Sequence, residues 1–501
     1  MMDDAREVDK SLLPLSGPGT GPWREALPCG YTSCGTLTYD HLTRTVERTF
    51  SRQGIEHEGA GILKSALKFD RGSAKRHSEA GVHLSQRELL LDHYAKEMVP
   101  VSLSAAARRL VRVFRPTIQK KTQVERQVDH LKTFVTYEPS GGRPPVENMN
   151  LCALRITWII PDFTPGAGGH MTIFRIASYL ERFGHDVRFL IQNPSVHKTG
   201  GAALETINKH FQPFSGSVEL FSGVTPHAEG DALIATDRFT CYPARAMERF
   251  TRKFYFVQDY ESAFYPAGTE ALLTEATYHF DFDCLCAGDW LHKRMSGQFG
   301  RWSMSWPLAF DGSVYNLGSP TNKRHHNRIA LYARYVTPRR AVELAFMALD
   351  ILKKRNVDFE VDFFGWELGN LSVDFPYRDL GILKAEELAQ LYREATIGVV
   401  FSATNHSLVN KEMMACGLPV IDFDLETVRS IFPDNTIAFA EPTPEGIADQ
   451  IERLLKKPEE RDRLRGGGLA FVKNLSWEKS ARLVEAAIQQ RVDHAVKHGV
   501  K

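Results

Sequence analysis

The sequence lacks the long apolar segments of a membrane-spanning protein and the excess of positive charge of a protein that coats nucleic acid. It has no apolar run near the roughly 18 to 20 residues that a membrane-spanning helix needs. Its 62 Lys and Arg residues are balanced by 61 Asp and Glu residues, so the formal net charge is only +1 and we expect no nucleic-acid partner. The first ten residues, MMDDAREVDK, lack the basic and apolar segments of a signal peptide, and we therefore expect a cytoplasmic protein.

Motifs for metals and dinucleotides are also missing. The seven cysteines are scattered, and the one close pair, Cys284 and Cys286, has no second pair or histidine cluster to complete the about four ligands of a metal site. We expect both to be buried thiols in a strand. No GxGxxG is present, and the Asp281-x-Asp283 pair begins just before a predicted strand instead of following one. The sequence therefore predicts no metal site and no cofactor.

The composition is that of a soluble globular chain with several domains. Hydrophobic residues make up 43% and charged residues 25% of the 501 positions, and this length predicts about two to four domains. Residues 1–150 form a polar N-terminal extension. We expect it to be partly disordered at first and then helical from Arg87 to Tyr137, with interruptions at Pro100 and Pro116. The stretch from Glu138 to Asn150, rich in Pro and Gly, predicts a linker.

Two series of alternating strands and helices follow this extension. In the first, the apolar run LRITWII (154–160), a glycine-rich turn, an amphipathic helix (171–184) and a strand (186–191) form the unit typical of a parallel sheet. A second series restarts at residue 328. The further predicted elements are strands at 231–236, 253–258, 282–287, 328–333, 359–365, 397–402 and 418–423, and helices at 342–356, 386–395, 408–417, 444–458 and 476–492.

These series predict an α/β protein with two tandem Rossmann-like domains, at 151–315 and 316–475, after the partly helical N-terminal region. A closing helix within 476–501 is expected to cross back to the first domain. Wholly apolar strands without alternation predict sheets that are covered on both faces. In such folds a ligand binds in the cleft at the carboxyl ends of the strands, so residues that follow strands are the candidates for function.

Two candidate clusters lie at helix starts, where anions bind. Gly168 and Gly169 come between the first strand and its helix, where backbone amides can hold an anion or a sugar hydroxyl; the alternative is an ordinary strand–helix turn. Arg334 and Arg339 follow the first strand of the second domain. Guanidinium groups at a helix start form a pyrophosphate clamp, because their fork geometry and the positive helix end act together; the alternative is a pair of solvated charges.

A third cluster lies in FSATNHSLVNKEMMACGLPVID, at 401–422. A strand is predicted to end at Ser402, and a polar loop leads into a helix that carries Glu412 one turn in. The carboxylate of Glu412 could accept hydrogen bonds from two ribose hydroxyls, and the amides at the helix start could meet a phosphate. The donor-facing loop is expected to comprise Thr404, Asn405, Ser407, Leu408 and Val409.

This third cluster resembles the donor-binding motif of retaining nucleotide-sugar glycosyltransferases of the two-Rossmann-domain fold, GT-B, of the family-four type. That motif has an acid, seven residues, a second acid and then Met-Ala-Cys-Gly-Leu-Pro-Val, and its second half is matched here by Glu412 and by Ala415 to Val420. Arg334 and Arg339 resemble the family's Arg and Lys pair. The resemblance covers about residues 152 to 490 and is nearest to rhamnosyltransferases of the bacterial S-layer and O-antigen type, through the stretches GGHMTIFRIASYL and YFVQDYESAFYP.

The resemblance implies a metal-independent hexosyltransferase that moves a sugar, with retention, from a nucleotide donor onto a bacterial surface polysaccharide or a lipid-linked glycan. It implies that Arg334 and Arg339 neutralise the diphosphate and that Glu412 holds the ribose. Where the family has its first acid, which contacts the transferred sugar, this chain has Thr404. We therefore expect a different sugar contact, and dTDP-L-rhamnose, which carries a 6-deoxy sugar, is compatible with this loss.

Residues at the strand ends of the first domain are candidates for the acceptor side. In related enzymes the strand before VQDYESAFYP often ends in a His-Asp pair, and here it ends in Gln258 and Asp259. A group at this place would orient the acceptor or accept its proton. The expected catalytic residues are Asp259, Glu261 and His170, and the expected acceptor contacts are Tyr260 and Asp237. For each of them a turn, capping or packing role is the alternative.

The N-terminal region also holds a basic segment between Ala105 and Lys132, where eight basic residues against two acidic ones give a local net charge of +6. Its first four arginines, which interleave with apolar residues, are Arg108, Arg109, Arg112 and Arg115. Such a surface binds anionic lipid with about 1 kcal/mol per charge, so a peripheral contact with the inner face of the cytoplasmic membrane is one expectation. A solvated helix face is the other.

Two further functions match parts of the sequence. A dinucleotide-dependent oxidoreductase or epimerase would need GxGxxG and a ribose-binding acid one strand later, and the sequence has neither. A non-catalytic glycan-binding or scaffold protein descended from a glycosyltransferase is favoured by Thr404. The retained Arg334, Arg339 and Glu412 argue against that second alternative.

Overall fold

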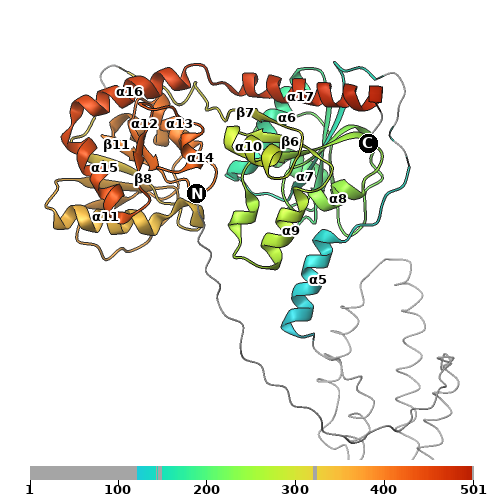
Figure 1. Cartoon of the computed structure of the whole chain (residues 1–501), viewed down its shortest axis with the longest axis horizontal. Coiled ribbons are helices and arrows are strands. Elements are labelled where there is room, and N and C mark those ends of the chain that lie inside the picture. The colour runs from blue at the N-terminus through green and yellow to red at the C-terminus, as the bar shows by residue number, and fades with distance from the viewer. Residues whose placement is uncertain (1–120, 143, 145–148, 320–323, 499–501) are drawn as a thin grey trace, which may run out of the picture. The chain divides into compact units, whose positions relative to one another are not determined.

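The computed structural model describes residues 121–142, 144, 149–319 and 324–498 (Figure 1). Most of the predicted N-terminal extension, including the four membrane-facing arginine candidates Arg108, Arg109, Arg112 and Arg115, lies outside these residues. In the part that is described, none of the helices is both long enough and apolar enough to span a bilayer.

The first domain is built on a parallel seven-stranded sheet in the order β3-β2-β1-β4-β5-β6-β7. The strands are β1 (Arg155–Pro161), β2 (Asp186–Gln192), β3 (Val218–Phe221), β4 (Gly230–Ala235), β5 (Phe250–Val257), β6 (Asp283–Ala287) and β7 (Ser303–Trp306). The helices are α6 (Gly168–Arg182), α7 (Gly200–His210), α8 (Cys241–Ala246), α9 (Thr269–Thr277), α10 (Asp289–Gly297) and the short 3-10 helix η1 (Glu261–Phe264). The central strand β4 is buried along its whole length, as expected for a sheet covered on both faces.

Large aromatic side chains fill the core of the first domain. Trp158 on β1 meets Phe256 on β5 edge to face at 5.2 Å, and Phe256 stacks on Trp306 of β7 at 4.8 Å. Cys284 and Cys286 on β6 are free thiols with at most 1% of their surface exposed, which confirms that they are buried in a strand.

The second domain is built on a parallel six-stranded sheet in the order β10-β9-β8-β11-β12-β13. Its strands are β8 (Arg328–Tyr332), β9 (Glu360–Phe364), β10 (Tyr377–Asp379), β11 (Ile397–Val399), β12 (Val420–Phe423) and β13 (Ala438–Ala440). Its helices are α11 (Val342–Lys354), α12 (Ala385–Glu394), α13 (Val409–Ala415), α14 (Glu426–Arg429), α15 (Pro444–Lys456), α16 (Pro458–Val472) and the 3-10 helix η2 (Pro338–Arg340).

Alternate residues of β8 enter two separate core clusters, one on each face of this sheet. Ile329 and Leu331 pack with residues of α11 and α15, whereas Ala330 packs with residues of α12 and α13. Helices therefore cover both faces of the second sheet too, and the two sheets confirm the predicted α/β class with two Rossmann-like domains.

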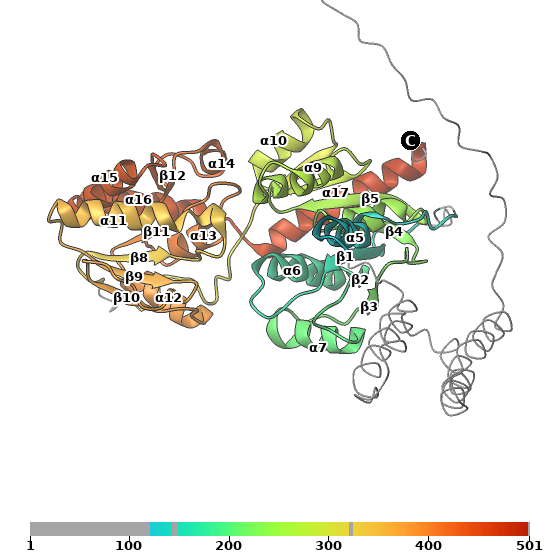
Figure 2. The ribbon, with the colours of Figure 1, turned by 90° about the horizontal axis from the view of Figure 1, so that it is seen from below.

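The last helix, α17 (Trp477–His498), packs on the first domain (Figures 1 and 2). Its buried residues follow the spacing of one helix face and join the core of that domain; they are Trp477, Ala481, Val484, Ala487, Ile488 and Val492. Figure 2 shows α17 beside α6, with which it is in contact. Polar contacts also fix it, because Arg491 Nε donates to Asp283 at 2.7 Å.

The described end of the N-terminal region contacts the first domain. Helix α5 (Gln123–Val135) begins with a capping box between Thr122 and Glu125, and Phe134 at its other end stacks on Phe239 at 4.2 Å. In the stretch that was expected to be a linker, the amide of Ser140 donates to the carbonyl of Ala246 at 2.8 Å. The beginning of this stretch is thus attached to the domain that follows it.

Candidate functional site

The loops after β8 and β11 lie where the strand order of the second sheet reverses. This is the position at which open α/β sheets bind ligands, beyond the carboxyl ends of their strands. The loop after β8 carries Arg339 and the loop after β11 carries Thr404 and Asn405, and the amide of Ala403 donates to the carbonyl of Arg339 at 3.1 Å. This backbone hydrogen bond fixes the two loops side by side.

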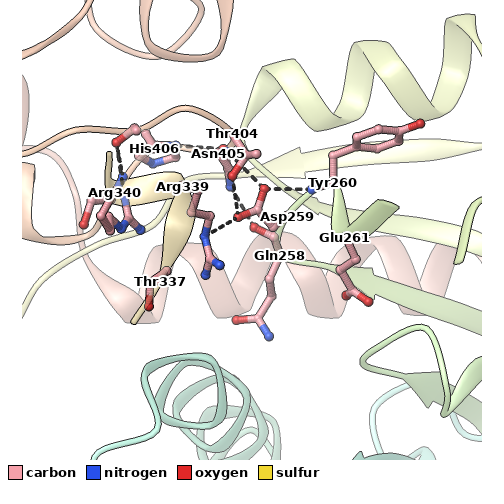
Figure 3. A network of polar contacts seen from close by, with 12 residues as sticks. Gln258, Asp259, Tyr260, Glu261, Thr337, Arg339, Arg340, Thr404, Asn405 and His406 are labelled. Atoms are coloured by element: carbon pink, nitrogen blue, oxygen red, sulfur yellow. Dashed lines mark hydrogen bonds and ion pairs between the residues drawn. The ribbon is translucent and has the colours of Figure 1, made fainter. Parts of the chain in front are cut away.

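Asp259, which follows β5 of the first domain, joins these loops (Figure 3). Its Oδ1 accepts hydrogen bonds from the amides of Tyr260 at 2.8 Å and Asn405 at 3.0 Å. Its Oδ2 accepts from Thr404 Oγ1 at 3.0 Å and lies 3.2 Å from Nε of Arg339. One carboxylate of the first domain therefore contacts three residues of the second.

The side chain of Asn405 completes the junction between the domains. Its Nδ2 donates to the carbonyl oxygens of Gln258 at 2.8 Å and Ala287 at 3.0 Å, at the ends of β5 and β6. Asn405 is only 3% exposed, so these are buried hydrogen bonds whose loss would leave carbonyls unpaired. The loop that was predicted to read the donor is thus attached to the acceptor-side domain.

Three arginines lie near this junction, and they differ in the partners of their guanidinium groups. Arg339 lies over the ring of Phe264 at 4.4 Å, with 31% of its side chain exposed. Arg334 lies over Trp366 at 5.3 Å and donates from Nε to Thr337 at 3.3 Å. Arg340 instead donates to the carbonyl of Phe401 at 2.9 Å, and its burial lowers its pKa. Arg334 and Arg339 can therefore bind an anion, whereas Arg340 fixes the loop.

Glu412 lies on α13, half-buried, and burial raises the pKa of its carboxyl to about 7. The positive charge of Arg175 on α6 opposes this rise. Among the described residues, none donates a hydrogen bond to the Glu412 carboxylate in the free protein. The carboxylate thus keeps its acceptor capacity for a ligand, as the ribose prediction requires.

The amides at the start of α13 already have partners. The amide of Ser407 donates to Ser402 Oγ at 3.1 Å, and that of Val409 donates to Ser407 Oγ at 3.3 Å. Leu408 is the residue just before the helix, which begins at Val409. Hydroxyls of the loop itself thus satisfy two of the amides that were expected to meet a phosphate, and the phosphate contact stays a prediction.

A buried polar chain behind the loop was not anticipated from the sequence. Lys411 Nζ donates to the carbonyl of Leu308 at 2.8 Å and to His406 Nε2 at 2.9 Å, and His406 Nδ1 lies 3.0 Å from Asn405 Oδ1. Burial lowers the pKa of Lys411 to about 7, and burial together with Lys411 lowers the pKa of His406. With His406 neutral, its Nδ1–H donates to Asn405 and orients that side chain. His406 and Lys411 are five positions apart in the sequence, a spacing that carries no recognised motif.

Two predicted acceptor-side residues turn away from Asp259 (Figure 3). The ring of Tyr260 is 8% exposed, stacks on Tyr278 at 5.4 Å and has the guanidinium of Arg294 at 3.8 Å on its face. Glu261 is buried and accepts from the amide of Arg238 at 2.8 Å. The ring of Tyr260 thus packs into the aromatic core beside α9 and α10 and does not point toward Asp259, and its contact with an acceptor stays a prediction.

The buried Glu261 and the partly buried Asp237 form an acidic pair beneath the ends of β4 and β5. Burial and the neighbouring Asp237 raise the pKa of Glu261 to about 8, and burial raises the pKa of Asp237. Asp237 Oδ1 accepts from the amide of Thr240 at 2.8 Å, which fixes the turn into α8. Both carboxyls thus hold turns, and the structure does not bring either beside Arg339.

The glycine turn and His170 lie at the start of α6. His170 Nε2 lies 3.1 Å from the carbonyl of Pro161, and burial lowers the pKa of its ring. This hydrogen bond ties the helix start to the end of β1. Space near Gly168 is open, and a Cβ added at Gly169 would lie 3.6 Å from Gln258 Nε2. The glycine turn therefore faces the end of β5, where Asp259 begins its loop.

Within the part of the chain that the structure describes, no group of three or more His, Cys, Asp or Glu side chains is placed to hold a metal ion. Metal independence stays a prediction.

Comparisons with known proteins agree with this fold. Residues 327–452, which hold Arg334, Arg339 and Glu412, match the family described as the WsaF C-terminal domain. The O-antigen biosynthesis protein RfbC of Myxococcus xanthus is 29% identical over 424 residues, which are 81% of this chain and 32% of RfbC. A D-inositol 3-phosphate glycosyltransferase of Frankia alni is 35% identical over 99 residues, 19% of this chain and 24% of that protein. This chain thus spans about a third or less of the length of these relatives.

Solved structures share the architecture at low identity. Sucrose-phosphate synthase from Thermosynechococcus elongatus aligns with a TM-score of 0.51 and 15% identity, over 68% of this chain and 99% of that one. Anabaena HepE in complex with UDP-glucose aligns with a TM-score of 0.51 and 15% identity, over 69% of this chain and 99% of that one. These likenesses establish the two-domain GT-B fold of residues that follow the N-terminal region.

Proposed function

We propose that this chain is a retaining glycosyltransferase that moves a sugar from a nucleoside-diphosphate donor onto a bacterial surface polysaccharide or lipid-linked glycan of the O-antigen kind. The observation that carries the proposal is the set of Arg334, Arg339 and Glu412 at the carboxyl edge of the second sheet of a GT-B fold. The match of residues 327–452 to the WsaF C-terminal domain and the likeness to an O-antigen biosynthesis protein support it.

The proposed roles follow from what each side chain can do. Arg334 and Arg339 present guanidinium forks to the two phosphates and stabilise the diphosphate as it leaves with the negative charge. Glu412 accepts hydrogen bonds from the ribose hydroxyls. Asp259, the one predicted acceptor-side acid that contacts the second domain, orients the acceptor hydroxyl. Closure of the two domains on the donor excludes the water that would hydrolyse it.

We propose dTDP-L-rhamnose as the donor. Thr404 stands where related transferases have an acid on the transferred sugar, and its hydroxyl is bonded to Asp259 at 3.0 Å. A neutral residue there suits a sugar with one hydroxyl fewer. Anabaena HepE, with the same fold, was solved with UDP-glucose, so a uridine donor is the competing possibility that the experiment must separate.

Thermal unfolding of the full chain with dTDP, UDP, GDP and NAD, and then with the matching sugar nucleotides, tests the proposal. A ligand at a hundredfold excess over its dissociation constant adds about 2.7 kcal/mol of stability. A shift with dTDP and dTDP-L-rhamnose alone supports the rhamnosyl assignment. A shift with UDP or GDP keeps the transferase but replaces the sugar, a shift with NAD alone overturns it, and no shift at all favours a non-catalytic glycan-binding protein.

Arg334→Ala sharpens this test. Hydrogen bonds to a charged group contribute about 1.5–3 kcal/mol, so we expect nucleotide affinity to fall about 10- to 100-fold, with transfer falling at least as much. Lys354→Ala, which removes an exposed positive charge at the far end of α11, is the matched control and should bind the nucleotide like the wild type. Equal affinity of the two variants, measured by calorimetry, would contradict the proposed diphosphate clamp.

A further inference from the structure

The ion pair between Asp259 and Arg339 connects the proposed acceptor side to the proposed diphosphate clamp. Among the described residues, Asp259 is the one carboxylate paired with Arg339, and Arg339 is the one cation paired with Asp259. Their closest atoms, Oδ2 and Nε, lie 3.2 Å apart. Each group is thus the counter-charge of the other while no donor is bound.

This contact is easier to exchange than the others that Asp259 makes. Oδ1 accepts two backbone amides at 2.8 and 3.0 Å, and Oδ2 accepts the hydroxyl of Thr404 at 3.0 Å. Within the described residues, in contrast, the buried Nε of Arg339 has no hydrogen bond of good geometry, so its link to the carboxylate is a charge attraction without a directed bond. The side chain of Arg339 is also 31% exposed, so a ligand can reach its guanidinium group.

A diphosphate is a stronger partner for this guanidinium than one carboxylate. It carries at least two negative charges, and its oxygens can meet the planar fork in a bidentate manner. Arg339 lies on the ring of Phe264 at 4.4 Å, a contact that keeps the flat group oriented while it changes partner. Binding of a diphosphate must therefore compete with Asp259 for Arg339.

We propose, in an inference that rests on the proposed function, that the donor diphosphate replaces Asp259 as the partner of Arg339. The Asp259 carboxylate then becomes free for the acceptor hydroxyl only after the donor has bound. The two amides and Thr404 keep the freed carboxylate in position. Oδ2 then lacks its counter-charge and faces the site as a hydrogen-bond acceptor for the incoming hydroxyl. Donor binding thereby prepares the acceptor side, and the donor binds first.

Calorimetric titration of the full chain with the nucleoside diphosphate that stabilises it tests the exchange. Asp259→Asn keeps the shape of the side chain but removes the competing charge, so we expect this nucleotide to bind about 2- to 5-fold more tightly, the range of a partly exposed ion pair. Transfer by the same variant should fall. In an Arg339→Ala background, Asp259→Asn should leave nucleotide affinity unchanged, because the competition is gone.

Asp289→Asn is the matched control. It removes an exposed carboxylate just after the neighbouring strand β6, and among the interactions of the described residues this carboxylate has none with Arg339. It should leave nucleotide affinity at the wild-type value. Asp259→Ser provides a second neutral variant if the first does not fold. Nucleotide binding that is unchanged or weaker in both Asp259 variants overturns the exchange alone, whereas a wild-type chain that binds no nucleoside diphosphate overturns the proposed function and the exchange together.

Discussion

Among the ionisable residues of the site, Glu412 has a pKa that is raised by burial and only partly lowered again by a neighbouring charge. Its pKa lies near 7, above the value of an exposed glutamate, with Arg175 as the charge that opposes the shift. Below that pH the carboxyl is protonated and loses acceptor capacity; above it the carboxylate can accept from both ribose hydroxyls. The proposed ribose contact should therefore strengthen as the pH rises.

We expect nucleotide affinity of the wild-type chain to rise about 3- to 10-fold between pH 6 and pH 8, a gain of roughly 0.7–1.4 kcal/mol. Glu412→Gln should bind the nucleotide more weakly at pH 8, and its affinity should lack this gain between pH 6 and pH 8. Because phosphate ionisation contributes equally to both proteins, the difference between their titrations isolates the carboxyl. Parallel pH profiles of wild type and Glu412→Gln would exclude the ionised Glu412 from the nucleotide site.

At the scale of single elements, α13 carries a buried cation, Lys411, which is 1% exposed. Within the described part of the chain, Lys411 has no carboxylate partner and bonds only to the carbonyl of Leu308 and to His406. Its folded pKa of about 7 lies below the unfolded value of 10.5. Between these values the unfolded chain binds the additional proton, so stability rises with pH in that window, and below pH 7 the full penalty of the buried charge applies.

Replacement of Lys411 by Met removes this proton linkage. We expect the wild type to gain stability relative to Lys411→Met by up to about 1.4 kcal/mol per pH unit between pH 7 and pH 10. Met leaves the Leu308 carbonyl and His406 without their donor, which costs about 1–3 kcal/mol at every pH. Urea unfolding of both proteins at several pH values gives the pH-dependent part and the constant part of the difference in their unfolding free energies. A difference between the two proteins that does not change with pH would show that Lys411 stays charged in the fold.

Elements were predictable from the sequence where burial is continuous. The long apolar strands β1, β4, β5 and β6 were found because all or nearly all of each run is buried. The four edge strands β3, β7, β10 and β13, of three or four residues each, were missed. Most residues of β3, β7 and β10 are only partly buried and give no apolar run, whereas β13 is apolar but has only three residues. Helix α16 runs on through three glycines, of which Gly467 allows the backbone of Asn435 to approach closely.

Site residues were predictable only as far as strand ends identify them. Asp259, Arg339 and Thr404 follow strands, and the structure brings them together. Whether a residue one position further faces the site depends on the turn that follows, and η1 directs Tyr260 and Glu261 into the first domain instead. The chain from Lys411 through His406 to Asn405 depends on burial between domains, which no local pattern reports.

At the scale of the whole chain, the last helix belongs to the domain that is first in the sequence. Ile488 on α17 is fully buried in the core of the first domain, and His185 of that domain lies 3.1 Å from Glu485 on the helix. The chain therefore passes between the domains twice, once before β8 and once before α17. A core defect in α17 should weaken the first domain and not the second.

Ile488→Ala should lower the unfolding free energy of the first domain by about 2–5 kcal/mol, the cost of a cavity at a fully buried site. Val496→Ala on the same helix, at a position 40% exposed, should change it by no more than about 0.5 kcal/mol. Tryptophan fluorescence reports mainly on the first domain and α17, through Trp158, Trp290, Trp302, Trp306 and Trp477. A nucleotide should stabilise the second domain in both variants. The nucleotide-dependent transition reports the second domain, and the tryptophan-monitored transition reports the first. If Ile488→Ala lowered the unfolding free energy of both transitions equally, the two domains would unfold as one unit and α17 would support both.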